Sequence, residues 1–222
     1  MSHIEKLMAG NQHFKDVKFK KHEKKLRQSI IDGQSPKALF IGCSDSRVLP
    51  MAMTSATPGD LFVVRNIGNF VAPYKPDEDY HSTASAIEYA VSVLKVGNII
   101  VCGHSHCGAC EALYKDISAP ELVHTKKWLE LGEPAKEYVK TILPHDASDR
   151  EKYRLTEKIS VVFQMQNLLT YPAVAKAVDE GTLAIHGWYY KIGRGEIEYY
   201  DVDEGNFKPF LSGNPKEDVD DE

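Results

Sequence analysis

Short apolar runs bounded by turn residues alternate with stretches of helical periodicity along this chain. Four such runs contain no Asp, Glu, Lys or Arg and lie at 38–42, 61–64, 98–103 and 183–190. Each has the length and the flanking residues typical of a buried strand. Between the second and third runs, apolar residues recur at helical spacing over 82–94. Apolar strands that alternate with helices predict a mostly parallel sheet with helices on both faces.

The rest of the pattern completes an α/β fold. Further helices are expected at about 1–33, 103–115, 120–139, 149–169 and 172–181. A turn at Gly193-Arg194-Gly195 leads into 196–200, which we interpret as an antiparallel edge strand beside the four strands of the central sheet. We expect a single domain over 1–222, in which 1–33 forms an N-terminal helical arm, 34–205 forms the core and 206–222 forms an acidic, disordered tail.

The composition is that of an ordinary soluble globular protein, with 42% hydrophobic and 27% charged residues. The formal net charge of −5 gives no reason to expect nucleic acid as a partner, and the lysine-rich segment 15–27 is interpreted as a solvated helix face. No apolar run approaches the roughly 18 residues that span a bilayer, and the N-terminus lacks the apolar stretch of a signal peptide. We therefore expect a cytoplasmic protein whose four cysteines are reduced, so that metal binding explains them better than disulfides.

Two short segments carry the candidate chemistry. Cys43-Ser44-Asp45-Ser46-Arg47 follows the first predicted strand, and His104-Ser105-His106-Cys107 follows the third. Because the carboxyl ends of adjacent parallel strands meet at one edge of a sheet, we expect the two segments to form one site. Cys43, His104 and Cys107 offer two thiolates and one imidazole, which suit Zn²⁺ and leave one coordination position for water. By themselves these ligands would also suit structural zinc or reduced core cysteines, but together with Asp45 and Arg47 after Cys43 they favour metal-activated water.

Asp45 could act in this site in two ways. It could accept a hydrogen bond from a zinc-bound hydroxide, or it could bind the zinc itself and close the site. A bidentate pair with Arg47 would hold the Asp45 carboxylate off the metal, so we interpret Asp45 and Arg47 as a gate. Cys107 and Cys110 could instead form a redox pair, but Cys107 is better used by zinc. Arg65 is interpreted as a structural tie at a strand end.

These residues resemble the signature of the β-class carbonic anhydrases, in which Cys-x-Asp-Ser-Arg is followed by His-x-x-Cys. The resemblance covers roughly residues 30 to 200 and extends to the segments at 34–37, 58–66, 86–90 and 103–105. It implies an enzyme that converts CO₂ and water reversibly to bicarbonate and a proton by means of a zinc-bound hydroxide, with one Zn²⁺ per subunit. It also implies the family's α/β fold, in which N-terminal helices embrace a partner to make a homodimer or homotetramer.

The resemblance also implies roles for individual residues. Cys43, His104 and Cys107 match the zinc ligands, and Asp45 and Arg47 match the catalytic pair. Gln34 matches a glutamine that donates a hydrogen bond to bicarbonate in the plant-like branch of the family. Two further matches, Phe62 and Tyr89, correspond to the apolar wall of the substrate pocket, which the neighbouring subunit contributes.

A second branch of the family is allosteric and carries a tryptophan three residues before the first zinc cysteine. Here that position is Phe40, and Gln34 is present, so we favour the open, plant-like branch. Two alternatives stay open from the residues themselves. The same site could act on another small linear substrate, such as carbon disulfide, or the chain could be a zinc-bearing sensor with Asp45 locked on the metal and no turnover.

Overall fold

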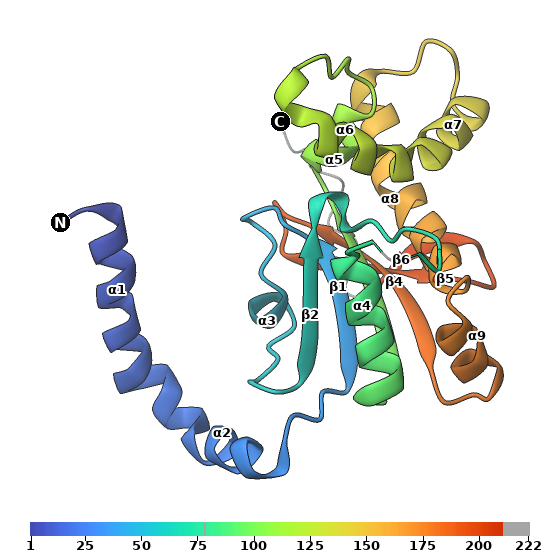
Figure 1. Cartoon of the computed structure of the whole chain (residues 1–222). Coiled ribbons are helices and arrows are strands. Elements are labelled where there is room, and N and C mark those ends of the chain that lie inside the picture. The colour runs from blue at the N-terminus through green and yellow to red at the C-terminus, as the bar shows by residue number, and fades with distance from the viewer. Residues whose placement is uncertain (78, 211–222) are drawn as a thin grey trace.

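The computed structural model describes residues 1–77 and 79–210, and its centre is a six-stranded sheet (Figure 1). The strands are β1 (Ala38–Cys43), β2 (Leu61–Asn66), β3 (Asn98–His104), β4 (Ala184–Lys191), β5 (Glu196–Asp201) and β6 (Asn206–Pro209). They are arranged in the order β2-β1-β3-β4-β5-β6. The first four strands in this order are parallel, and β5 and β6 are antiparallel additions. The predicted α/β fold with four parallel strands is therefore confirmed.

The helices occupy the segments between the strands. The α-helices are α1 (His3–His13), α2 (Lys20–Asp32), α3 (Pro50–Met53), α4 (Ser82–Glu88), α5 (Gly108–Ala112), α6 (Val123–Leu129), α7 (Glu133–Ile142), α8 (Asp149–Leu168) and α9 (Pro172–Asp179). Two π-helical segments are η1 (Phe14–Phe19) and η3 (Tyr89–Val93). Three short 3₁₀-helices are η2 (Ile67–Asn69), η4 (Pro120–Leu122) and η5 (Glu130–Gly132). The long α8 begins at a capping box, in which the Ser148 and Glu151 side chains satisfy each other's backbone amides.

The main core lies on one face of the sheet. Alternate residues of β1 and β3, among them Leu39, Ile41 and Ile99, pack against α4, η3, α8 and α9 and are fully buried. The intervening residues, Phe40 and Ile100, point to the other face, where they meet α3 and the aromatic residues of β4. Because both faces of β1 are buried, the strand has no polar positions, which is why it reads as one apolar run.

Two details differ from the sequence-based prediction. The predicted helix at 120–139 is broken into η4, α6, η5 and α7. Pro134 lies in the first turn of α7, where a missing amide proton is tolerated, and it disfavours a continuous helix through the preceding residues. The predicted edge strand is β5, but it lies inside the sheet, since Asn206–Pro209 adds β6 beyond it. Antiparallel strands can be joined by a short turn, and the turn after β5 brings four residues that were predicted as tail back beside it. These residues form backbone hydrogen bonds with β5. Residues 211–222 of the predicted tail lie outside the described residues.

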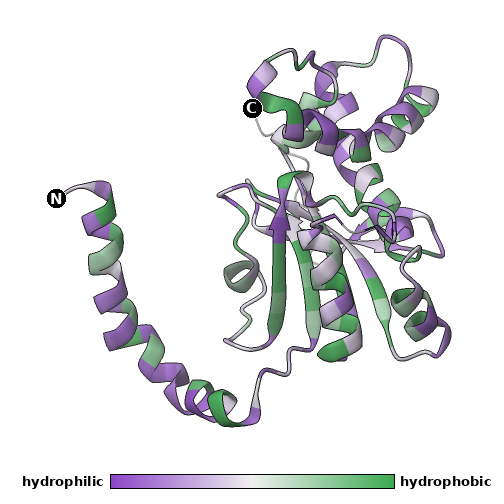
Figure 2. Cartoon of the chain, viewed as in Figure 1, coloured by the Kyte–Doolittle hydropathy of each residue, from purple (hydrophilic) through white to green (hydrophobic). Residues whose placement is uncertain are grey.

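The N-terminal arm of α1, η1 and α2 projects away from the sheet (Figure 1). None of its residues is buried, although Leu7, Met8, Ile30 and Ile31 are large and apolar. Figure 2 shows such hydrophobic positions spread among hydrophilic ones along the arm. The side chain of Lys25 ties the arm to the core through Asp60 and Thr57. Within the described part of the chain, the helices are too short or too polar to cross a membrane.

Candidate metal centre

Three potential metal ligands meet where β1 and β3 end. The two strands are parallel neighbours, so their carboxyl ends lie at the same edge of the sheet. Cys43 is the last residue of β1 and His104 is the last residue of β3, while Cys107 stands immediately before α5. Their Sγ and ring nitrogen atoms lie within 4.8 Å of one another, and all three residues are buried. The structure thus brings together the two segments that lie about sixty residues apart in the sequence.

The imidazole of His104 is oriented by the backbone. Its Nδ1 lies 2.9 Å from the carbonyl oxygen of Ser105, which can only accept, so Nδ1 carries the proton. The Nε2 atom is therefore left with a lone pair, and it is buried with no hydrogen-bond partner within the described residues. Ser105 is itself fixed, since its hydroxyl accepts a hydrogen bond from the amide of Ile192 and its amide donates to the carbonyl of Tyr190. A buried lone pair of this kind costs free energy unless a cation or donor meets it.

The two thiols fit a dication in the same place. The neighbouring Cys107 thiol and burial raise the pKa of Cys43 to about 12, and contact with the Cys110 thiol and burial raise the pKa of Cys107. Two adjacent thiolates are therefore unfavourable here unless a positive charge lies between them. Two thiolates, one imidazole nitrogen and one remaining position form the donor set of a catalytic zinc site, and the residues present fit that metal.

Asp45 is held away from the ligands by Arg47. The guanidinium donates from Nε to Asp45 Oδ1 at 2.9 Å and from Nη2 to Asp45 Oδ2 at 2.7 Å, which is a bidentate pair. The backbone amide of Arg47 adds a third hydrogen bond to Oδ1. These bonds keep the pKa of the Asp45 carboxyl well below its usual range, so the side chain is an anion at every ordinary pH.

The backbone around the ligands is fixed by two further side chains. Arg65, on β2, donates to the carbonyl oxygens of Cys43 and Asp45 at 2.9 and 2.6 Å, as expected for a structural tie. Glu157, on α8, accepts a hydrogen bond from the amide of Cys107 at 2.9 Å. Glu157 could not be predicted from the sequence, because a glutamate within a helical stretch gives no signal that it points inward.

The three predicted pocket residues lie elsewhere in the chain. Leu39 pairs with Phe62 and Cys43 pairs with Asn66, so Phe62 stands four residues, or roughly 13 Å, along the sheet from the metal ligands. The ring of Tyr89 lies 5.9 Å from that of Phe62. Gln34 is exposed and precedes the first residue of β1, at the opposite end of the strand from Cys43. Within one chain, these residues do not line the Cys43 cluster.

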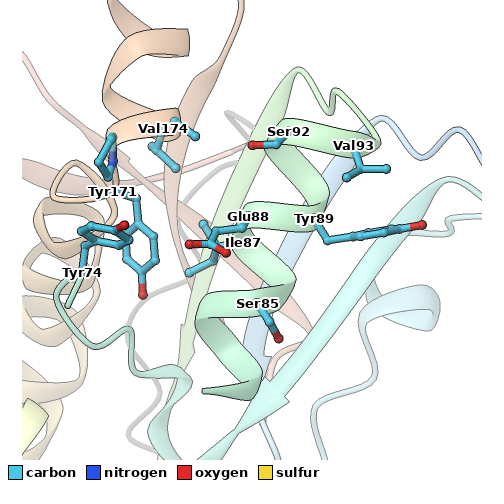
Figure 3. Close-up of a pocket in the computed structure, with 11 residues that line it drawn as sticks. Tyr74, Ser85, Ile87, Glu88, Tyr89, Ser92, Val93, Tyr171 and Val174 are labelled. Carbon is cyan, nitrogen blue, oxygen red and sulfur yellow. The ribbon is translucent and has the colours of Figure 1, made fainter. Parts of the chain in front are cut away.

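A groove of about 470 Å³ lies beside Tyr89, between α4, η3 and the start of α9 (Figure 3). Tyr74 and Tyr171 form one wall, and Tyr89 points away from them toward β2. None of the predicted metal ligands lines this groove. The candidate chemistry therefore belongs to the buried cluster at the strand ends rather than to the groove.

Comparison with known proteins gives a consistent family. The family model described as carbonic anhydrase matches residues 38–197. A carbonic anhydrase of Pseudomonas aeruginosa is 42% identical over 176 residues, covering 79% of this chain and 78% of the relative. A carbonic anhydrase of Synechocystis is 40% identical over 200 residues, covering 89% of this chain and 71% of the relative.

Solved structures agree with the sequence relatives. The β-carbonic anhydrase CcaA superposes with a TM-score of 0.87 at 37% identity, covering 96% of this chain and 94% of that one. A tetrameric β-carbonic anhydrase from Sordaria macrospora superposes with a TM-score of 0.75 at 29% identity, covering 88% of this chain and 95% of that one.

Proposed function

The chain belongs to the β-class carbonic anhydrases, and from this premise we propose that it hydrates CO₂ with a zinc ion held by Cys43, His104 and Cys107. The observation that carries the proposal is the buried Nε2 lone pair of His104, which faces two buried thiols and has no other partner within the described residues. Bound there, zinc would lower the pKa of a water molecule to about 7 and so supply a nucleophile for the carbon of CO₂.

Asp45 and Arg47 have the arrangement of an open gate. Arg47 engages both carboxylate oxygens of Asp45, so the carboxylate is held beside the ligands rather than among them. A carboxylate has about four lone-pair positions, so Asp45 can still accept one hydrogen bond from the attacking oxygen and orient it toward the substrate. This arrangement supports the open, plant-like branch that the sequence predicts.

We propose that a second copy of the chain completes the substrate pocket. Gln34, Phe62 and Tyr89 lie too far along the sheet to reach the cluster of their own chain, so the roles implied for them require a neighbour's cluster. The unburied apolar residues of the N-terminal arm offer a surface for that neighbour, and the tetrameric fungal relative supports self-association. A homodimer or homotetramer would thus bring one chain's pocket wall to the other chain's metal.

Stopped-flow measurement of CO₂ hydration from pH 6.5 to 9, on zinc-replete protein, tests the proposed mechanism. Fast turnover at neutral pH that disappears on removal of zinc with a chelator and returns on its addition is the expected result. Turnover only at alkaline pH would mean that Asp45 closes the site. Full zinc content without turnover at any pH would favour the alternatives of another small linear substrate or a sensor.

The cytoplasmic location rests on the sequence alone. We propose it because Cys43, Cys102, Cys107 and Cys110 are all free in the structure, and free thiols suit a reducing compartment. Cell fractionation with an antibody against the protein would test this location.

A further inference from the structure

A single peptide group links the candidate gate to the candidate metal ligands. It joins His106 to Cys107, and both of its polar atoms are occupied by side chains. The carbonyl oxygen of His106 accepts a hydrogen bond from Arg47 Nη2 at 3.0 Å. The amide of Cys107 donates to Glu157 Oε1 at 2.9 Å. Because the C=O and N–H of a trans peptide point in opposite directions, the group is held from both sides.

The backbone at this point needs to be held. His106 has a φ of +57°, in the left-handed region that non-glycine residues adopt at a cost. Such conformations persist where the surrounding structure over-determines them. The side chain of His106 is exposed, so its own packing does not impose the conformation. The two hydrogen bonds to the following peptide fix it from one side, and the hydrogen bonds that hold Ser105 fix it from the other.

Glu157 is a rigid support for this peptide. It lies on α8 with 4% of its surface exposed, and its second oxygen accepts a hydrogen bond from the hydroxyl of Tyr189 at 2.6 Å. Tyr189 is itself 1% exposed and belongs to β4. The Glu157 carboxylate thus accepts hydrogen bonds from the Cys107 amide, next to α5, and from the Tyr189 hydroxyl on β4. These two bonds restrict its side chain to one conformation. Burial raises the pKa of Glu157, in keeping with its removal from water.

We propose that Glu157 is a positioning residue that orients both Cys107 and Arg47. It does so by fixing the His106–Cys107 peptide, whose amide belongs to Cys107 and whose carbonyl binds Arg47. The inference rests on the proposed function, since it assumes that Cys107 binds zinc and that Arg47 holds Asp45 away from it. Without the Glu157 carboxylate, the His106–Cys107 peptide loses one of its two anchors and can rotate. That rotation turns the carbonyl away from Arg47 and changes the direction of the Cys107 side chain, so both zinc retention and the gate are weakened.

Four variants separate this role from general stability. Glu157→Ala removes the acceptor, whereas Glu157→Gln keeps an oxygen that can accept from the Cys107 amide. Tyr189→Phe removes only the outer hydrogen bond. Gln164→Ala is the matched control, because Gln164 is a fully buried polar residue on the same helix. It accepts hydrogen bonds from Val71 and Asn167 and donates to the carbonyl of Leu131.

Two measurements on the full chain report on the metal centre without relying on turnover. The first is the rate at which zinc passes to a chelator in excess. The second is the visible spectrum of the cobalt-substituted protein during titration with thiocyanate, which changes only when an anion can reach an open coordination position. Wild-type CO₂ hydration and zinc content are measured beside them.

We expect Glu157→Ala to release zinc about 10- to 100-fold faster than wild type. The response of its cobalt spectrum to thiocyanate should weaken, because Arg47 loses the His106 carbonyl that orients it and restrains Asp45 less firmly. Glu157→Gln should restore most of both properties, Tyr189→Phe should lie between Gln and Ala, and Gln164→Ala should match wild type. Wild-type behaviour of Glu157→Ala would overturn the inference alone, as would an equal loss in Gln164→Ala. A wild-type protein that binds no stoichiometric zinc would overturn the proposed function and the inference with it.

A second measurement covers the case in which Glu157→Ala fails to fold. In protein labelled with ¹⁵N-cysteine, the amide proton signal of Cys107 should change its chemical shift in Glu157→Gln, because the oxygen that accepts its hydrogen bond then belongs to a carboxamide instead of a carboxyl group. It should stay in place in Gln164→Ala. An unmoved Cys107 signal in Glu157→Gln would show that the carboxylate does not hold this amide, and the inference would be wrong.

Discussion

Replacing Arg47 with alanine should close the site on Asp45. In the native protein, the guanidinium makes two hydrogen bonds to the Asp45 carboxylate, at 2.9 and 2.7 Å, and a third to the carbonyl of His106. The alanine variant leaves the Asp45 anion beside the metal ligands with nothing but a backbone amide to restrain it. The carboxylate is then free to take the coordination position that water needs.

The size of the effect follows from the exposure of the pair. Buried hydrogen bonds to charged groups contribute about 1.5–3 kcal/mol each. Half of the Arg47 side chain faces solvent, at 49% exposure, so screening reduces the contribution of the pair and we take about 2 kcal/mol in total. This free energy corresponds to a change of about 30-fold in the balance between open and closed sites. We expect kcat/KM for CO₂ at neutral pH to fall by at least about that factor.

Stopped-flow CO₂ hydration with zinc analysis of each sample provides the assay. Arg47→Lys should recover only part of the activity, because an ammonium group cannot engage both oxygens as the planar guanidinium does. Lys140→Ala is the control, since Lys140 also pairs with an acidic residue, Glu137, but lies on α7, outside both the metal centre and the arm. Protonation of Asp45 does not explain a loss at pH 7, because its pKa would only return toward about 3.9. Near-normal turnover of a zinc-replete Arg47→Ala protein would refute the gate.

Three further predictions test the surroundings of the site. Glu198→Gln should lower the free energy of unfolding by about 2 kcal/mol in urea titration, because it breaks a buried contact with two lysine ammonium groups. Burial alone would raise the pKa of Glu198, but the two lysines outweigh it and lower the pKa. The loss of unfolding free energy relative to wild type should therefore be largest at neutral pH and shrink below about pH 4, where the native carboxylate is protonated. A loss that does not change with pH would contradict this. Gly103→Ala should lower the melting temperature and zinc content together, since its Cβ would lie 2.6 Å from Val161 Cγ2; an unchanged melting temperature would show that the helix yields. Cys110→Ser should keep stoichiometric zinc and most of the activity, whereas loss of both would point to a functional pair with Cys107.

Much of the fold could be predicted because the hydrophobicity of each strand matches the burial of that strand in the folded protein. Strands buried on both faces, such as Ala38–Cys43, tolerate no charged residue, so they appear in the sequence as apolar runs. The first polar or turn residue after such a run marks the end of the strand. The candidate ligands Cys43 and His104 come directly at those ends, and the rule that parallel strands share a carboxyl edge was enough to predict that they meet. The residues' catalytic roles come from the family resemblance and stay predictions.

The sequence by itself therefore determined the α/β class, the four parallel strands and the residue types at the candidate metal centre. Only the tertiary structure decided that Glu157 points inward to the Cys107 amide, that His106 adopts a left-handed backbone, and that the ring of Tyr89 lies against that of Phe62. The physical reason is that hydrophobic periodicity reports which face of an element is buried, whereas a hydrogen bond between residues fifty positions apart depends on how two elements pack. A single buried polar contact leaves no periodic trace in the chain, and its position becomes visible only when the helix lies on the sheet.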